Sequence, residues 1–175
     1  MMERQQRPIL LLLALMIAAP VSLLAADVER IELIQRPEVM TSQQRVVGNL
    51  RAVAMTDGIV VRVPQLYIYY TDYSSAFHLP GFRRGFDRRL SLIIDRQRRE
   101  RSMVALDRML ERTVTPAGEP FLIEDLPDAD LYILLYSRAN CEECEQVEET
   151  LVEWIEQQED RRIVRLDIRT DVEPD

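Results

Sequence analysis

The residues in this chain best suited to chemistry are two cysteines, Cys141 and Cys144. A Cys-x-x-Cys pair brings its sulfurs together within one helical turn. Such a pair can therefore cycle between dithiol and disulfide with little backbone movement. Thiol–disulfide exchange is the first chemistry this spacing indicates, with both cysteines as candidate catalytic residues.

A strand and a helix are expected to position the pair. The apolar run 131–136 is short, aromatic-rich and bounded by polar residues, which is typical of a parallel strand buried on both faces. Asn140 is predicted to cap the following helix at Cys141, with Glu143 reaching back to the cap. The apolar stripe of this helix comprises Cys144, Val147, Leu151, Trp154 and Ile155.

This helix predicts different roles for the two thiols. Cys144 starts the buried stripe, whereas Cys141 lies at the exposed helix start, where free amides and the helix dipole favour a negative sulfur. Cys141 is therefore the expected attacking thiol and Cys144 the resolving one. The residues expected to tune the thiol pKa are Arg138, Asn140, Glu142 and Glu143. The two glutamates should raise the thiol pKa, which favours a reductant or slow exchanger over a strong oxidant.

Residues 130–168 resemble the active-site βα unit of the thioredoxin superfamily. They depart from thioredoxin itself in three ways. Glu142-Glu143 replaces the usual Gly-Pro, Asn140 stands where a Trp commonly precedes the first Cys, and Leu135 occupies the place of a buried acid that assists proton transfer in many members.

A second stretch, 58–68, also resembles this superfamily. It looks like the segment in which a cis-proline begins the strand opposite the Cys-x-x-Cys. The resemblance implies that Val63 and Pro64 line the groove that binds substrate. The alternative is a trans-proline on an edge strand.

The order of these parts is unusual, because in thioredoxins the Cys-x-x-Cys unit precedes the cis-proline strand. We expect an α/β fold with a thioredoxin-like central mixed sheet flanked by helices, circularly permuted or incomplete. The expected parts are a signal peptide or uncleaved anchor (1–26), an N-terminal α/β part (27–112), a linker (113–130) and the Cys-x-x-Cys βαβ part (131–170). The first and last α/β parts are expected to share one sheet, because an isolated βαβ unit of about forty residues buries too little area to be stable. The rival is a separate N-terminal module whose thioredoxin-like tail completes its sheet with a second chain.

Further elements follow from periodicity. Strands are expected at 28–34, 65–70, 76–79 and 164–168, and helical faces at 42–55, 86–94 and 103–110. His78, the sole histidine, is expected to be a packed or surface residue. The arginine-rich region 83–101 is either a solvated surface that offsets the acidic half or a docking surface for an acidic partner or membrane headgroups.

Composition and the N-terminus bear on partners and location. The chain has 175 residues and a formal net charge of −8, which argues against nucleic acid as a partner. Arg4 and Arg7 precede an uncharged run, 8–26, which predicts an export signal cut after Ala25 or Ala26, or an uncleaved anchor in the inner membrane. Either form places the folded part in an oxidising space such as a bacterial periplasm.

The expected function is that of an exported thiol–disulfide oxidoreductase acting on protein disulfides. Its electrons would come from another dithiol protein, such as a membrane dithiol reductant, without an organic cofactor. A metal site is not expected, since tetrahedral zinc needs four ligands and only His78 joins the two cysteines. The alternative is a non-catalytic interaction module of a cell-envelope assembly in which the cysteines form a structural disulfide.

Overall fold

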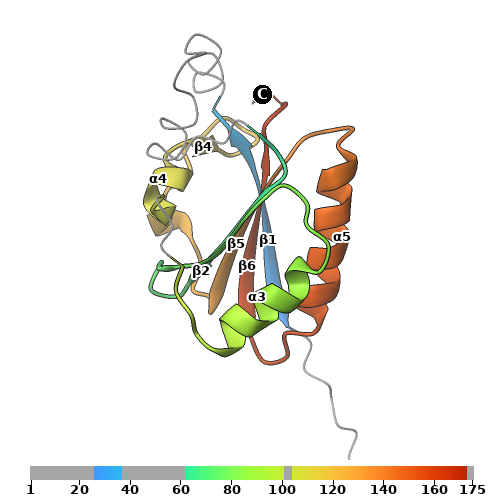
Figure 1. Cartoon of the computed structure of the whole chain (residues 1–175). Coiled ribbons are helices and arrows are strands. Elements are labelled where there is room, and N and C mark those ends of the chain that lie inside the picture. Colours follow the sequence, from blue (N-terminus) through green and yellow to red (C-terminus); the bar gives the residue numbers. More distant parts are fainter. Residues whose placement is uncertain (1–25, 37–61, 101–103, 173–175) are drawn as a thin grey trace, which may run out of the picture.

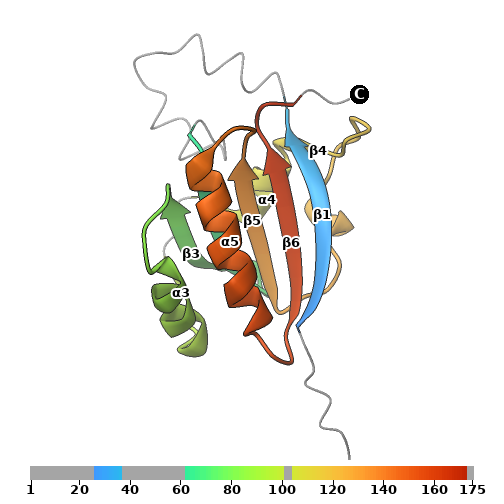
Figure 2. The same cartoon turned by 90° about the vertical axis from the view of Figure 1, so that its right-hand side faces the viewer.

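A mixed six-stranded sheet with helices on both faces forms the body of the molecule (Figures 1 and 2). The computed structural model describes residues 26–36, 62–100 and 104–172. The expected signal segment, the expected helix at 42–55 and residues 58–61 lie outside this described part, except for Ala26 at the end of the signal segment. The prediction of an α/β fold built on a mixed sheet is confirmed.

The strands lie in the order β3-β2-β5-β6-β1-β4. Strand β5 runs parallel to β6, and β6 runs parallel to β1. Strands β2 and β3 are antiparallel to their neighbours on one side, and β4 is antiparallel to β1 on the other. The bounds are β1 Asp27–Gln35, β2 Gln65–Tyr70, β3 Ser75–Pro80, β4 Thr113–Val114, β5 Leu131–Ser137 and β6 Arg162–Arg169.

Strand β5 lies inside the sheet, between β2 and β6, as its unbroken apolar run predicts. Each residue from Leu131 to Tyr136 is at most 2% exposed. Side chains alternate between the two faces of a strand, so β5 supplies both hydrophobic cores. Leu131, Ile133 and Leu135 enter one core, whereas Tyr132, Leu134 and Tyr136 enter the other.

The helices divide between these two cores. Helices α3 (Phe86–Asp95) and α5 (Glu142–Glu156) cover one face of the sheet and lie side by side there (Figure 2). Helix α4 (Leu106–Leu110) and the 3₁₀ turn η1 (Ile123–Asp125) contribute to the core on the other face. Trp154 of α5 donates from its indole nitrogen to the Ser91 hydroxyl of α3 at 3.0 Å, which fixes the two helices against each other.

Strands from distant parts of the sequence are neighbours in this sheet. Strand β2 of the N-terminal part pairs with β5, and β1 pairs with β6 of the C-terminal part. The connecting stretch 113–130, expected to be a linker, carries β4 and η1. The expected helical faces at 86–94 and 103–110 correspond to two helices: α3 ends at Asp95, and α4 begins at Leu106.

Candidate functional site

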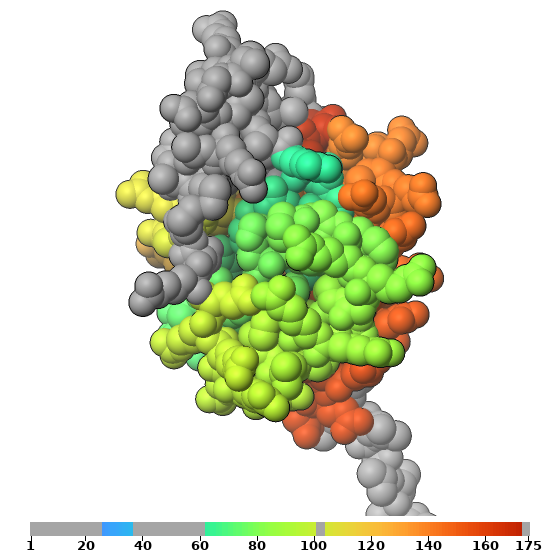
Figure 3. All heavy atoms as spheres, in the orientation of Figure 1, coloured from blue at the N-terminus to red at the C-terminus, as the bar shows by residue number. Residues whose placement is uncertain are grey.

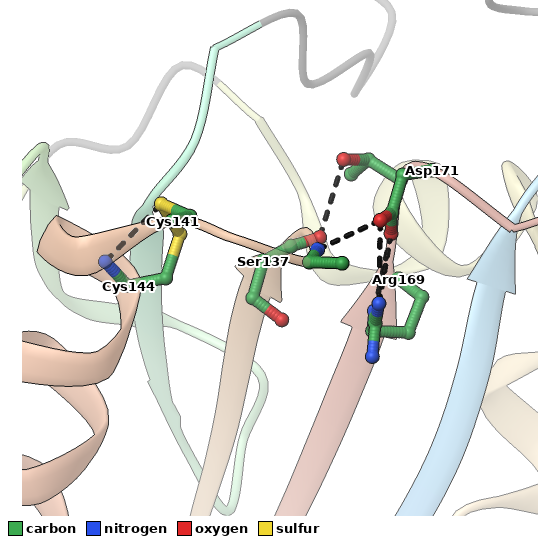
Figure 4. The surroundings of a disulfide bond; sticks show 7 residues. Ser137, Cys141, Cys144, Arg169 and Asp171 are labelled. Atoms are coloured by element: carbon green, nitrogen blue, oxygen red, sulfur yellow. Dashed lines mark hydrogen bonds and ion pairs between the residues drawn. A yellow bond between two sulfur atoms is a disulfide. The ribbon is translucent and has the colours of Figure 1, made fainter.

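Cys141 and Cys144 form a disulfide at the N-terminus of α5 (Figure 4). Helix α5 begins at Glu142, and Cys141 is its N-cap residue. The backbone amide of Cys144 donates to the Cys141 carbonyl at 2.9 Å and also to the Cys141 Sγ at 3.2 Å, so this amide of the helix start is shared between oxygen and sulfur.

The prediction that Asn140 caps this helix is wrong. An N-cap residue needs extended backbone angles, and Cys141 has them, with φ −120° and ψ 94°. Asn140 instead has a φ of 53°, in the left-handed region that Asn tolerates better than most residues. Its conformation turns the chain so that the next residue, a cysteine, takes the capping position.

The two sulfur-bearing residues differ in exposure. Cys144 is only 5% exposed and packs at the start of the buried stripe of α5. Cys141 is partly exposed at the end of the sheet. An incoming thiolate therefore has access to the sulfur of Cys141 before that of Cys144, because the rate of exchange depends on access.

The loop between β5 and α5 is tied to the end of β6 (Figure 4). The amide of Ala139 donates to Oδ2 of Asp171 at 2.7 Å, and the amide of Thr170 donates to the Ser137 carbonyl at 3.0 Å. Arg169 pairs with Asp171 at 3.1 Å. These contacts hold the peptide chain just before Cys141 in place.

The electrostatics of Asp171 follow from these contacts. Partial burial raises its pKa, but the Ala139 amide and the Arg169 guanidinium outweigh that effect, so the pKa lies below the usual aspartate value. Asp171 is therefore ionised at neutral pH.

Val63 and Pro64 lie at the same end of the sheet as the disulfide. The peptide bond between them is cis, and Pro64 is buried. The next residue, Gln65, pairs with Tyr136 near the end of β5. In the view of Figure 4, the segment that leads into β2 passes behind the disulfide.

Gly81 links this segment to the helix start. Its amide donates to the Pro64 carbonyl at 2.8 Å. A Cβ placed on Gly81 would lie 3.8 Å from Oε2 of Glu143. The proline segment and the first turn of α5 therefore meet at Gly81.

The charged and polar residues proposed to tune the thiols lie at this edge. Arg138, Asn140, Glu142 and Glu143 are all exposed. Glu142 accepts from the side-chain amide of Gln146 at 3.2 Å, and Glu143 reaches Gly81. The carboxylates near the disulfide are thus solvated, which weakens their effect on a neighbouring sulfur.

A buried ionic cluster beneath α5 was not anticipated from the sequence. Arg165 is 3% exposed and pairs with Asp167 and Glu148, each at 2.7 Å. Arg30 of β1 also pairs with Asp167 and, at 3.2 Å, with Glu148. Asp167 lies directly opposite Leu135 in the β5–β6 register. An acid is therefore present in the layer beneath the Cys-x-x-Cys helix, on β6 and ion-paired with arginines.

The cluster holds Glu148 in its charged form. Burial raises the pKa of Glu148, but hydrogen bonding and attraction from Arg165 and Arg30 lower it further than burial raises it. The sequence contains one signal of this ionic cluster. Side chains alternate along β6, so Arg165 and Asp167 share a face with the buried residue Ile163.

His78 is packed against an aromatic ring. Its imidazole stacks on Tyr67 with ring centres 4.3 Å apart, and Nε2 lies 3.0 Å from Oε1 of Gln65. Burial lowers the pKa of His78, with a smaller opposing effect of Glu100. Its ring is therefore neutral at pH 7.

A polar hollow of about 540 Å³ lies at the other end of the sheet. Its lining includes Tyr70 at the end of β2, Asp130 just before β5 and Arg161 just before β6. The hollow is therefore separated from the cysteines by the length of the strands.

The described residues lack two further features. No helix there is both long and apolar enough to cross a bilayer. The same ranges contain no group of three or more His, Cys, Asp or Glu side chains placed to hold a metal ion.

Comparisons with known proteins give no match for this chain. No protein-family model, no curated protein sequence and no solved structure matches this chain significantly.

Proposed function

We propose that this chain is a thiol–disulfide exchange protein with a circularly permuted thioredoxin-like architecture. One observation carries the proposal: a partly exposed cysteine caps a helix while its partner three residues later is 5% exposed beneath it. A redox pair needs this asymmetry, because the substrate must reach one sulfur, and the other sulfur must stay protected until it attacks the mixed disulfide.

The topology supports the permuted architecture. In the resemblance noted above, the Cys-x-x-Cys unit is followed by the proline strand, a hairpin partner and a helix. Here β5, α5 and β6 form the Cys-x-x-Cys unit, and β2, β3 and α3 occupy the expected later places although they come earlier in the chain. Strand β1, parallel to β6, extends the sheet on the far side.

The proposed exchange is balanced in atoms and electrons. In the reduced form, the Cys141 thiolate attacks one sulfur of a substrate disulfide, and the other substrate sulfur leaves as a thiolate that takes up a proton. Cys144 then loses its proton and attacks the Cys141 sulfur, which releases the second substrate thiol and forms the Cys141–Cys144 disulfide. Two electrons pass to the substrate, and a second dithiol protein returns the pair to its reduced form.

The helix start assists the first step. The Cys144 amide that reaches the Cys141 sulfur at 3.2 Å would stabilise a thiolate more than a neutral thiol. The neighbouring Glu142 and Glu143 oppose that effect to a small extent, because both are solvated, and this opposition favours a reductant or a slow exchanger. Val63 and Pro64 are proposed to contact the substrate backbone, because they share this end of the sheet with the disulfide.

The proposed location is outside the cytoplasm. The uncharged run 8–26 after Arg4 and Arg7 supports export, with the folded part in the periplasm or held at the inner membrane. The proposed partners are protein disulfides and a membrane dithiol reductant.

Trapping tests this function. Cys144→Ala in the full chain should accumulate mixed disulfides through Cys141 in cells, which a reductant releases and mass spectrometry identifies. The matched control, Cys141→Ala, keeps one cysteine but should trap far less, since Cys144 is buried. Equal trapping by both variants, or none by either, would contradict the exchange reaction.

A second candidate is a non-catalytic interaction module with a structural disulfide. The anchoring of the loop by Asp171 favours it, because a rigid disulfide at a fixed loop also suits a purely structural role. Thermal unfolding with and without reductant separates the two. A structural disulfide predicts a marked loss of stability on reduction, and the exchange function predicts a stable reduced form.

A further inference from the structure

Helix α5 carries an acidic surface. The residues from 139 to 160 include no Lys or Arg. The solvent side of α5 and the turn after it expose a series of carboxylates. We use "acidic surface" for Glu142, Glu145, Glu149, Glu153, Glu156 and Glu159.

Helix α3 carries a basic surface beside it. Arg89 is paired with Glu100, and Arg99 with Asp72. The other arginines among residues 83–100 are exposed and have no ion pair among the described residues. We use "basic surface" for these residues: Arg83, Arg84, Arg88, Arg96 and Arg98.

The two surfaces are neighbours but do not neutralise each other. Helices α3 and α5 lie side by side on the same face of the sheet (Figure 2), and Figure 3 shows the α3 region forming much of the surface beside α5. A hydrogen bond from Trp154 to Ser91 joins them. No ion pair joins an α3 arginine to an α5 glutamate in the part of the chain that the structure describes. Both surfaces are therefore available to an outside partner.

We propose that the partner is a second copy of this chain, bound through the α3–α5 face. A two-fold axis lying in the interface, roughly along the seam between α3 and α5, places α3 of each copy over α5 of the other. This rotation brings the basic surface of each copy against the acidic surface of the other. The same contact is therefore made twice, as an isologous interface requires.

The two helices also agree in direction. Helix α3 follows β3, which ends opposite Gln65, and α5 follows β5, which ends near the same residue. Both helices therefore run away from the disulfide end of the sheet, with α3 beginning further along and lying oblique to α5 (Figure 1). A rotation about an axis along the seam keeps this general direction, so α3 of one copy crosses α5 of the other.

An exposed apolar residue of α3 lies at the centre of this arrangement. Leu92 on α3 is 44% exposed. Ser91 sits at the level of Trp154, so Leu92 of one copy comes over the exposed residues Glu149 and Glu153 on the solvent side of α5 of the other. Arg88 and Arg96, four residues before and after Leu92, then approach Glu149 and Glu156.

The dimer should be weak and sensitive to salt. Helix α3 has ten residues, about 15 Å in length, so the face is smaller than the roughly 800 Å² per partner of a standard interface. Exposed charges supply much of the attraction and are screened by salt. Both Cys141 residues would lie at the same end of the dimer. The inference does not depend on the redox function.

Charge reversal tests the pairing in the full chain. Two differently tagged copies are co-expressed and co-purified at about 50 mM and about 500 mM salt, where the Debye length falls roughly threefold. The wild-type chains should co-purify at low salt and lose most of that association at high salt. Arg88→Glu with Arg96→Glu should abolish association, as should Glu149→Arg with Glu156→Arg, and mixing the two double variants should restore it.

A matched control changes the same charge elsewhere. Glu119→Arg with Glu124→Arg alters the net charge as much as the α5 reversal does, at exposed positions outside α3 and α5. It should leave association unchanged. A photo-crosslinking residue at Leu92 should capture the α5 peptide that contains Glu149 and Glu153 of the other copy, and the same residue at exposed Leu122 should not.

The outcomes that overturn the proposal are equally definite. They are a wild-type chain that does not self-associate at low salt, double variants that stay associated, or a mixture that fails to recover. Capture at Leu92 of only a different protein would also overturn it.

Discussion

Oδ2 of Asp171, just after β6, accepts the amide of Ala139, two residues before Cys141, at 2.7 Å. This bond restrains the loop that presents the disulfide. Asp171→Asn should lower the free energy of unfolding by about 0.5 to 1 kcal/mol, since a hydrogen bond to a charge is lost from an exposed site. It should also speed reduction of the disulfide by dithiothreitol about threefold, because the loosened loop improves access to Cys141.

Asp130 offers a matched control. Its carboxylate accepts the Arg162 amide at 2.8 Å, at the end of the sheet away from the cysteines. Asp130→Asn should cost similar stability in urea denaturation but leave the reduction rate unchanged. Equal acceleration by both variants would mean that general loosening, rather than the Asp171 bond, controls access.

The same bond predicts a pH dependence. The pKa of Asp171 is lower in the folded chain than its ordinary value of 3.8, owing to Ala139 and Arg169 acting against partial burial. The folded state therefore binds fewer protons than the unfolded state at that pH. Its stabilisation is fully present above the ordinary pKa and is lost as the pH falls through the lowered pKa. Acid unfolding of Asp171→Asn should lack this contribution.

The sequence predicts the local elements of the site well. The apolar run of β5 is bounded by polar residues, and the stripe from Cys144 to Ile155 has helical periodicity, so both elements follow from chain-local patterns. The N-cap could not be predicted in the same way. Asn140 and Cys141 compete for that position, and the choice depends on a left-handed φ that the residue type allows but does not require.

The buried ions required information from distant parts of the chain. Alternation in β6 places Arg165 and Asp167 on one face, and such charged residues are ordinarily solvated. They are buried here because α5 covers that face and β1 supplies Arg30 from the start of the chain. Strand order is likewise a property of pairing between distant segments, which periodicity does not encode.

Two tyrosines on the same face of β5 should respond oppositely to loss of the hydroxyl. The Tyr136 hydroxyl is buried and has no hydrogen-bond partner among the described residues, whereas the Tyr132 hydroxyl donates to the Pro127 carbonyl at 3.1 Å. Tyr136→Phe should raise the free energy of unfolding by about 1 kcal/mol, and Tyr132→Phe should lower it by about 1 kcal/mol. Urea denaturation measures both, and a loss of stability in Tyr136→Phe would contradict the first expectation.

Arg165 should be the most sensitive residue of the ionic cluster. Its side chain is 4% exposed, so Arg165→Met leaves the nearly buried Asp167 with Arg30 alone. We expect a loss of about 3 kcal/mol in urea denaturation. Arg162→Met, at an exposed position of the same strand, should change stability by less than about 0.5 kcal/mol. Similar losses from both variants would indicate that the paired charges of Arg165 contribute little.

The reduced chain should distinguish its two thiols by their reaction with iodoacetamide. Cys141 caps α5 and is partly exposed, and Cys144 is 5% exposed against the core. In the folded reduced chain, Cys141 should be modified at least about tenfold faster, because alkylation needs an accessible thiolate. Mass spectrometry of timed samples gives the two rates. The difference should vanish in urea, where neither thiol is protected by structure. If Cys144 reacts as fast as Cys141 while the chain is folded, the reduced helix start opens, and the division into attacking and resolving thiols fails.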